Sequence, residues 1–211
     1  MKIMICVPCM DMTTVTFTQS LATLRKVGET QIIFKTGSLI YSSRNQLAAD
    51  AIKAGVDYVV WFDADMSFQP DTLERLIQRL EEGCDIISGL YFRRLAPFTP
   101  VLFKWLNIDS VLNRWQGYDD YPEDSLFELQ GIGFGCCAMK AEVLMDLIAT
   151  EKQPFTPLEG FGEDLSFCIR ARKHGYKIWC DSTIKCGHTG HITITEEYYK
   201  AFREEKAKEE K

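Results

Sequence analysis

Four short apolar runs punctuate the first ninety residues of the chain. Each run is bounded by polar residues or glycine, and none alternates strictly between apolar and polar positions. Such runs are typical of strands that are buried on both faces, as in a parallel sheet. The predicted strands are Ile3–Val7, Gln31–Phe34, Tyr58–Phe62 and Asp85–Leu90.

Segments with helical spacing separate these runs. Apolar residues at i, i+3, i+4 and i+7 from Leu73 predict an amphipathic helix. Ser43 and Gln46 fit a capping box that opens a second helix, which ends near Gly55, and residues 14–27 predict a weaker one. The resulting β-α-β-α-β-α-β order predicts an α/β domain with right-handed crossovers.

The pattern changes after Leu90. Residues 91–129 contain prolines, several aromatic side chains and an acidic turn, and they predict two short strands joined by a long loop. A loop of that length in a compact domain is more often functional than idle. Regular elements then return. The later predicted strands are Val101–Leu106, Phe127–Gln130, Cys136–Met139 and Lys177–Cys180, and the later helices carry Val143–Ile148, span Glu163–His174 and begin again at Glu196.

Net charge and hydropathy limit the classes of partner that the chain is expected to bind. The 211 residues include 30 acidic and 24 basic side chains, for a net charge of −6. A protein that binds duplex nucleic acid usually has a basic face, so this class is disfavoured. No apolar stretch approaches the length of a membrane span, and the apolar run at the start of the chain is too short for a signal peptide. We therefore expect a cytoplasmic protein without a transmembrane segment.

Eight cysteines raise the question of disulfides or zinc. Without a secretion signal, reduced thiols are the default. The Cys6–Cys9 pair has Cys-x-x-Cys spacing, but a single such pair is a weak zinc or redox signal. The spacing of Cys180, Cys186, His188 and His191 fits no zinc pattern, so no zinc site is expected there.

Two aspartates follow the third predicted strand, in Trp61-Phe62-Asp63-Ala64-Asp65. Ligands of open α/β sheets bind at this edge, and an extended chain points both carboxylates to the same side. Hard oxygen ligands select Mg²⁺ or Mn²⁺. The alternative is a strand that ends in an ordinary turn, where Asp is common.

A second acidic pair, Glu163 and Asp164, follows a glycine-rich turn at the start of a predicted helix. The helix dipole favours negative charge there. A structural cap accounts for one acid and leaves the other free for proton transfer or acceptor binding. Farther along, His188 lies between glycines, where it can approach a metal closely, although a lone histidine is more often structural or merely exposed.

In this order the motifs resemble the nucleotide-sugar-dependent glycosyltransferases of the GT-A fold, especially the small family 2-like enzymes often found in bacteria and phages. The resemblance covers nearly the whole chain. It implies an α/β GT-A fold with a mostly parallel central sheet and helices on both faces. The motifs are Val7-Pro8, Ser43-Arg44-Asn45, Asp63-Ala64-Asp65, Gly131–Gly135, Glu163-Asp164 and His188.

The resemblance also implies an activity and roles for the acids. A sugar would move from a nucleotide diphosphate donor to an acceptor hydroxyl. Asp65 and His188 would bind Mn²⁺ or Mg²⁺, and Asp63 would contact the ribose or the metal through water. Asp164 would be the catalytic base of an inverting reaction, and Glu163 would assist in acceptor binding.

The donor and acceptor are expected on different parts of a single domain, residues 1–211. In the nucleotide-binding half, 1–90, Arg44 would lie near the diphosphate and the backbone at Pro8 and Cys9 would border the base. A UDP-sugar is favoured, although the second strand lacks the acid that many relatives place against the base. The acceptor-side half, 91–192, carries Trp115, Gly133 and Phe134 as acceptor or lid residues, and 193–211 form a C-terminal helix or tail.

Other interpretations stay open. The neighbouring Arg93 and Arg94 could hold a phosphate or an acidic acceptor, but solvation at the surface is the commoner role. A sugar nucleotidyltransferase would need a glycine-rich basic loop after the first strand, and Pro8-Cys9-Met10-Asp11 lacks one. A catalytically idle GT-A-like domain would bind a nucleotide or a partner protein, but here the metal and base positions are filled. The acceptor could be a glycan, a protein or a small molecule.

Overall fold

The first ninety residues fold as alternating strands and helices, as their apolar pattern predicts. The computed structural model describes residues 1–107, 109, 114–191, 195–198, 200–201 and 203. Strands β1, β3 and β5 are almost wholly buried because both of their faces are covered. The elements are β1 (Lys2–Cys9), α1 (Val15–Thr23), β2 (Glu29–Thr36), α2 (Ile40–Ala54), β3 (Tyr58–Phe62), β4 (Met66–Ser67), α3 (Thr72–Glu81) and β5 (Ile86–Leu90).

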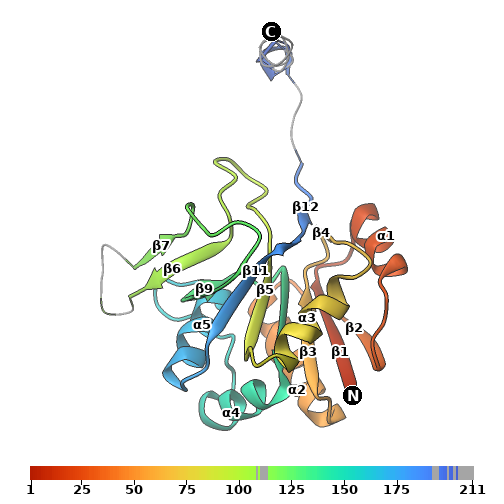
Figure 1. The fold of residues 1–211 in the computed structure, drawn as a ribbon, viewed down its shortest axis with the longest axis vertical. Coiled ribbons are helices and arrows are strands. Elements are labelled where there is room, and N and C mark those ends of the chain that lie inside the picture. Colours follow the sequence, from red (N-terminus) through yellow and green to blue (C-terminus); the bar gives the residue numbers. More distant parts are fainter. Residues whose placement is uncertain (108, 110–113, 192–194, 199, 202, 204–211) are drawn as a thin grey trace.

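Later strands complete the central sheet. β10 inserts between β3 and β5 and runs antiparallel to both, while β11 lies parallel to β5. Among the described residues the order is β2-β1-β3-β10-β5-β11-β8, and five of these seven strands run in one direction (Figure 1). This confirms the expected mostly parallel sheet. The added elements are β8 (Leu126–Leu129), β10 (Cys136–Lys140), α4 (Ala141–Glu151), α5 (Glu163–Lys173) and β11 (Ile178–Lys185).

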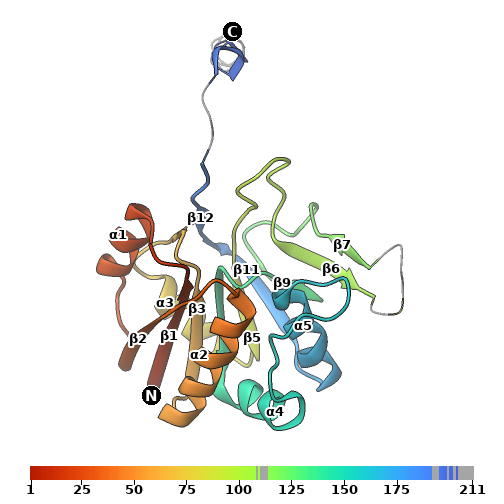
Figure 2. The same cartoon turned by 180° about the vertical axis from the view of Figure 1, so that it is seen from behind.

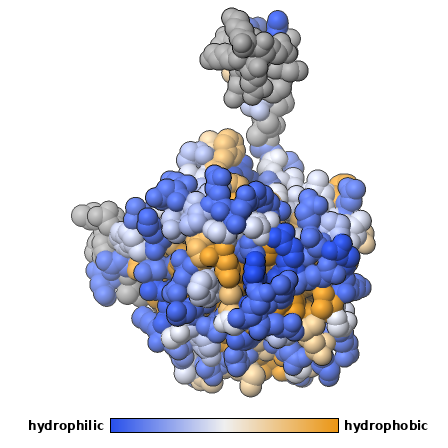
Figure 3. All heavy atoms as spheres, in the orientation of Figure 1, coloured by the Kyte–Doolittle hydropathy of each residue, from blue (hydrophilic) through white to orange (hydrophobic). Residues whose placement is uncertain are grey.

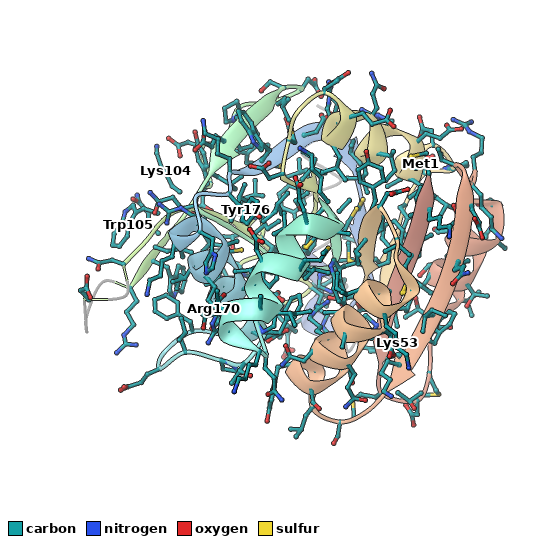
Figure 4. The ribbon with its side chains drawn as sticks, turned by 90° about the horizontal axis from the view of Figure 1, so that it is seen from below. Met1, Lys53, Lys104, Trp105, Arg170 and Tyr176 are labelled. Carbon is teal, nitrogen blue, oxygen red and sulfur yellow. The ribbon has the colours of Figure 1, made fainter. Side chains whose placement is uncertain are left out.

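Helices cover both faces of the sheet. α1 and α3 lie over one face (Figure 1), and α2, α4 and α5 lie over the other (Figure 2). An apolar cluster fills each side. Trp61 and Phe134 belong to the cluster under α2, α4 and α5, whereas Phe62 belongs to the other. Met1 and Lys53 lie at the lower end of the molecule, which Figure 4 shows from below. The carboxyl ends of β1 and β3 therefore meet at the upper end.

Helix α3 shows how local sequence sets the packing. Its apolar stripe is buried against the sheet, while the charged positions between remain at the surface. Gly83 follows the helix with φ of +114°, a conformation that favours glycine. The stripe consists of Leu73, Leu76, Ile77 and Leu80.

The predicted start of α2 and the predicted end of α1 are wrong, whereas the end of α2 at Gly55 and the start of α1 at Thr14 agree with the prediction. α2 begins at Ile40, so Ser43 lies inside its first turns and is not an N-cap. Ser43 is buried beside Gly37, where an added Cβ would lie 2.8 Å from its hydroxyl oxygen. Close packing against this turn therefore replaces the capping role. α1 ends at Thr23 rather than near residue 27.

Two small sheets form outside the central one. β4 pairs with β12 (Gly187–His188), and β6 (Leu102–Leu106) pairs with β7 (Trp115–Gly117) and β9 (Gly131–Ile132). β7 lies where a continuous loop was predicted, and 108 and 110–113 of that loop lie outside the described residues. The tail predicted over 193–211 is described only at 195–198, 200–201 and 203.

The cysteines, all of which lie among the described residues, form no disulfide bonds. All eight cysteines are free, and seven of them are buried. None of the helices that the structure describes combines the length and apolar character needed to span a bilayer.

Candidate active site

The turn after β3 is held from three directions. The Asp63 backbone N–H donates to the Gly135 carbonyl at 3.1 Å, which ties the turn to the segment before β10. Ala64 accepts from the Thr14 N–H at 3.0 Å, and Asp65 accepts from the Thr189 N–H at 2.8 Å. Both aspartates therefore leave the sheet in a fixed frame, at the edge where ligands of α/β sheets bind.

Pairing of β12 with β4 brings His188 to Asp65. The His188 Nε2 atom lies 3.4 Å from Asp65 Oδ2, and its Nδ1 lies 2.9 Å from the Phe92 carbonyl oxygen. With Nδ1–H donating to that carbonyl, Nε2 faces Asp65 and can take either a proton or a metal ion. Burial raises the pKa of Asp65, but the hydrogen bond and charge of His188 outweigh it, and the pKa of this carboxyl lies below its usual value.

Arg94 reaches the same carboxylate from the connection between β5 and β6. Its Nη1 forms an ion pair with Asp65 Oδ2, the oxygen that also faces His188. Its side chain is 53% exposed, whereas that of Asp65 is 22% exposed. The sequence left Arg93 and Arg94 open between binding a phosphate or acidic acceptor and solvation at the surface, and it did not indicate the pairing of Arg94 with Asp65. The available signal was their position just after β5, at the ligand edge of the sheet.

Arg44 is buried on α2, with only 1% of its side chain exposed. Its guanidinium lies 5.8 Å from the centre of the Trp61 ring and 5.4 Å from that of Phe134. These aromatic faces attract the cation, but they do not neutralise it. A buried arginine needs anionic partners as well.

Three carboxylates supply that compensation. Arg44 Nη2 donates to Asp63 Oδ1 at 2.9 Å, and Arg44 Nε lies 3.6 Å from both Glu163 Oε1 and Asp164 Oδ1. The carboxylate side chains are 28%, 19% and 27% exposed, respectively. Arg44 thus links the turn after β3 to the start of α5, and its guanidinium faces these acids instead of solvent.

One oxygen of Asp164 is hydrogen-bonded, whereas the other has only the longer ion pair with Arg44 Nε. Its Oδ2 accepts a hydrogen bond from the Phe134 backbone N–H at 3.3 Å. Its Oδ1 is buried and has no hydrogen-bond partner among the described residues. Burial raises the pKa of Asp164 well above its usual value, against the opposing charge of Arg44 and with the further help of Glu163. A carboxylate in this state is suited to accept a proton.

Glycines before β10 allow Tyr91 to approach the site. The Tyr91 hydroxyl accepts from the Gly135 N–H at 3.0 Å, and an added Cβ on Gly133 would lie 2.1 Å from that hydroxyl. Gly133 is therefore required by a close contact. Phe134, between the two glycines, is fully buried against Arg44, so only its backbone N–H serves Asp164.

The remaining predicted residues lie at the end of β1 and on β7. Pro8 is buried near the end of β1, and Cys9 is half-buried with its carbonyl accepting from the Gly37 N–H at 3.0 Å. Trp115 on β7 is 46% exposed and packs against Phe103 and the guanidinium of Arg93.

Metal-binding side chains come together only as a pair. In the described part of the chain, no group of three or more His, Cys, Asp or Glu side chains could hold a metal ion. Asp65 and His188 face each other, whereas the Asp63 carboxylate is turned to Arg44. The possible zinc group at Cys180 and Cys186 is likewise not formed among these residues.

The mixed sheet, with acids at the end of β3 and at the start of α5, has the architecture of GT-A nucleotide-sugar transferases. The chain belongs to the family described as Glycosyl transferase family 2, whose model matches residues 29–147. Both findings confirm the resemblance seen in the sequence.

Two solved structures share this fold. A197 from STIV is 18% identical with a TM-score of 0.63, and the match covers 90% of this chain and 87% of that one. GalNAc-T7, solved with UDP, GalNAc and Mn²⁺, is 9% identical with a TM-score of 0.63, and the match covers 90% of this chain but 43% of that one. At these identities the likeness concerns the fold. No curated protein sequence matches the chain.

Proposed function

We propose that this chain is an inverting glycosyltransferase that moves a sugar from a nucleoside diphosphate donor, with a UDP-sugar favoured, to an acceptor hydroxyl. The observation that carries the proposal is the buried Asp164 Oδ1, which lies 3.6 Å from Arg44 Nε but accepts no hydrogen bond from the described residues. A buried carboxylate oxygen without a hydrogen bond is costly, and groups with such perturbed surroundings cluster at functional sites. The acceptor hydroxyl is a donor of the required kind.

The reaction is a single displacement. The acceptor oxygen attacks the anomeric carbon while its proton passes to Asp164 Oδ1. The bond from that carbon to the diphosphate oxygen breaks, and the diphosphate leaves with the electron pair. Phe134 N–H and Arg44 fix the orientation of the carboxylate before the acceptor arrives. A positioned base of this kind contributes typically ~10²–10⁴-fold.

This role predicts the acid limb of the pH profile. Asp164 acts in its deprotonated form, so turnover is lost as the pH falls through its pKa. Because burial raises that pKa, the limb in kcat should lie well above the ordinary aspartate range near pH 4. Measurement of kcat against pH at saturating donor checks this. A limb at pH 4 or below would assign the proton transfer to another group.

The Asp65–His188 pair fits a divalent cation. A carboxylate oxygen and an imidazole nitrogen that face each other at 3.4 Å suit Mn²⁺ or Mg²⁺. Two protein ligands are enough, because Mg²⁺ commonly binds through one or two carboxylates together with substrate phosphates and water. When bound, the cation would neutralise the charge that develops on the leaving diphosphate. The contact between Nδ1 of His188 and the Phe92 carbonyl would orient the imidazole toward it.

Asp65→Ala should abolish metal-dependent donor binding. The substitution removes the only carboxylate that faces His188 in the described site, while Asp63 remains paired with Arg44. Calorimetric titration of UDP with Mn²⁺ and then with chelator gives the measurement, and circular dichroism verifies the fold. Equal UDP affinity in chelator and in Mn²⁺ for the unmodified protein would remove the metal from the proposal.

The donor and the acceptor would bind to different halves of the chain. Residues 1–90 would hold the nucleotide, with the backbone at Pro8 and Cys9 beside the base, and residues 91–192 would hold the acceptor. Trp115 is the exposed aromatic residue proposed to meet the acceptor.

The direct test of function is a screen of nucleotide sugars for Mn²⁺-dependent transfer or hydrolysis. Binding of UDP without turnover of any donor would favour an idle binding domain instead.

A further inference from the structure

One oxygen of Asp65 serves two positive partners. Arg94 Nη1 and His188 Nε2 both approach Oδ2. A cation bound between Asp65 and His188 needs this same oxygen. Arg94 and the cation are both positively charged, so at Asp65 Oδ2 they would repel each other as well as compete for the oxygen. Arg94 and a cation at this oxygen would therefore weaken each other's binding.

The backbone of Arg94 is fixed although its side chain is half-exposed. Its carbonyl oxygen lies against Gly190, where an added Cβ would be 2.8 Å away. The connection that carries it is closed by hydrogen bonds from Arg93 N–H to the Thr99 carbonyl and from Val101 N–H to the Tyr91 carbonyl. The guanidinium can therefore leave Asp65 by side-chain rotation and still remain beside the site.

The tip of this connection projects from the upper end of the molecule. Leu95 is 68% exposed and Phe98 is 55% exposed, and the apolar colour over the connection between β5 and β6 is visible at the top of Figure 3. Arg94 is thus attached to a surface segment and does not belong to the core.

We propose that Arg94 is the resident counter-ion of the metal site and couples metal binding to donor binding. Without a divalent cation, its guanidinium compensates Asp65. The incoming cation displaces it, and the diphosphate of the donor then takes it up. A guanidinium binds phosphate oxygens in a paired geometry that an ammonium does not offer. The inference rests on the proposed metal-dependent function and adds a competing side chain to it.

The proposed role of Arg94 has opposite effects on metal binding in the absence and in the presence of a diphosphate. Metal alone must break the Arg94–Asp65 pair, so its affinity is reduced. Metal in the presence of a diphosphate recovers that loss, because Arg94 finds a new anionic partner. Removal of the guanidinium should therefore strengthen binding of metal alone and weaken the cooperativity between metal and nucleotide.

Calorimetric titration of Mn²⁺ into the full chain, with and without UDP, tests this directly. Arg94→Gln should bind Mn²⁺ alone about 2- to 5-fold more tightly, the range for a partly exposed ion pair. The factor by which UDP improves Mn²⁺ affinity should fall in the same variant. Arg93→Gln is the matched control, because it removes the same charge from the neighbouring residue, which lies over Trp115. Its Mn²⁺ affinity should equal that of the unmodified protein.

The outcomes separate this inference from the function on which it rests. If the unmodified protein binds Mn²⁺ and Arg94→Gln has the same affinity and the same response to UDP, the counter-ion role is wrong and the metal site stands. An equal gain in Arg93→Gln would also overturn it, by reducing the effect to overall charge. If the unmodified protein binds no Mn²⁺ even with UDP, both the metal site and the role of Arg94 fail.

Discussion

Asp164→Asn is expected to lower turnover by on the order of 10²-fold or more while UDP binds with unchanged affinity in Mn²⁺. The amide preserves the shape of the side chain and can still accept from the Phe134 N–H. It has no basic oxygen to receive the proton of the acceptor. Single-turnover kinetics with the identified donor, together with calorimetric titration of UDP, separate the chemical step from binding.

Glu163→Gln is the matched control for this substitution. It removes one charge from the adjacent residue of α5, which lies at the same 3.6 Å distance from Arg44 Nε. A smaller loss than in Asp164→Asn is expected, because Asp164 carries the buried oxygen that lacks a hydrogen bond. Near-normal turnover in Asp164→Asn would point to a retaining mechanism or to another base. A loss confined to Glu163→Gln would exchange the roles of the two acids.

Arg44→Met should reduce the free energy of unfolding by about 3 kcal/mol, toward the lower end of the range for breaking a buried ion pair. The lower end applies because the carboxylates of Asp63, Glu163 and Asp164 are each about a quarter exposed. Methionine fills much of the space between the aromatic rings but leaves three acids uncompensated. Chemical denaturation at neutral pH measures the loss, which should shrink as acid protonates these groups.

Arg25→Met provides the comparison. Arg25 also pairs with a carboxylate, Glu74 at 2.6 Å, but both side chains are substantially exposed, at 57% and 40%. Such a pair contributes little to stability, because water and salt screen it. If Arg44→Met were no more destabilising than Arg25→Met, the buried cation would not be what holds the acids of the two site segments together.

The fold could be predicted from sequence where burial leaves a local pattern. Apolar runs predicted the central strands β1 and β3, and apolar spacing predicted α3. The capping pattern at Ser43 predicted the wrong start for α2, because a serine also suits a tight contact inside the helix, here with Gly37. The two-residue strands β4 and β12 could not be predicted, since two residues show no periodicity.

Apart from Asp65 with His188, the sequence indicated residue types for the candidate site but not which residues pair. Asp63 and Asp65 are neighbours in sequence, yet they take different arginine partners, Arg44 and Arg94. Burial of Arg44 depends on acids more than a hundred residues away on α5, and nothing near Arg44 in the sequence reports them. The pairing of Arg94 was missed for the same reason, because Asp65 follows another strand.

Because β10 lies between β3 and β5, the central sheet cannot be completed until β10 has been synthesised. During synthesis, β3 and β5 emerge with apolar faces and unpaired backbone groups along the edges that β10 later joins. Exposed strand edges invite pairing with other chains. A fragment that ends near residue 90 would consist of two sheet pieces without their shared partner, so it would be prone to aggregate. Residues 136–140 must therefore leave the ribosome before the strands that carry the acids after β3 can take their places in the complete sheet.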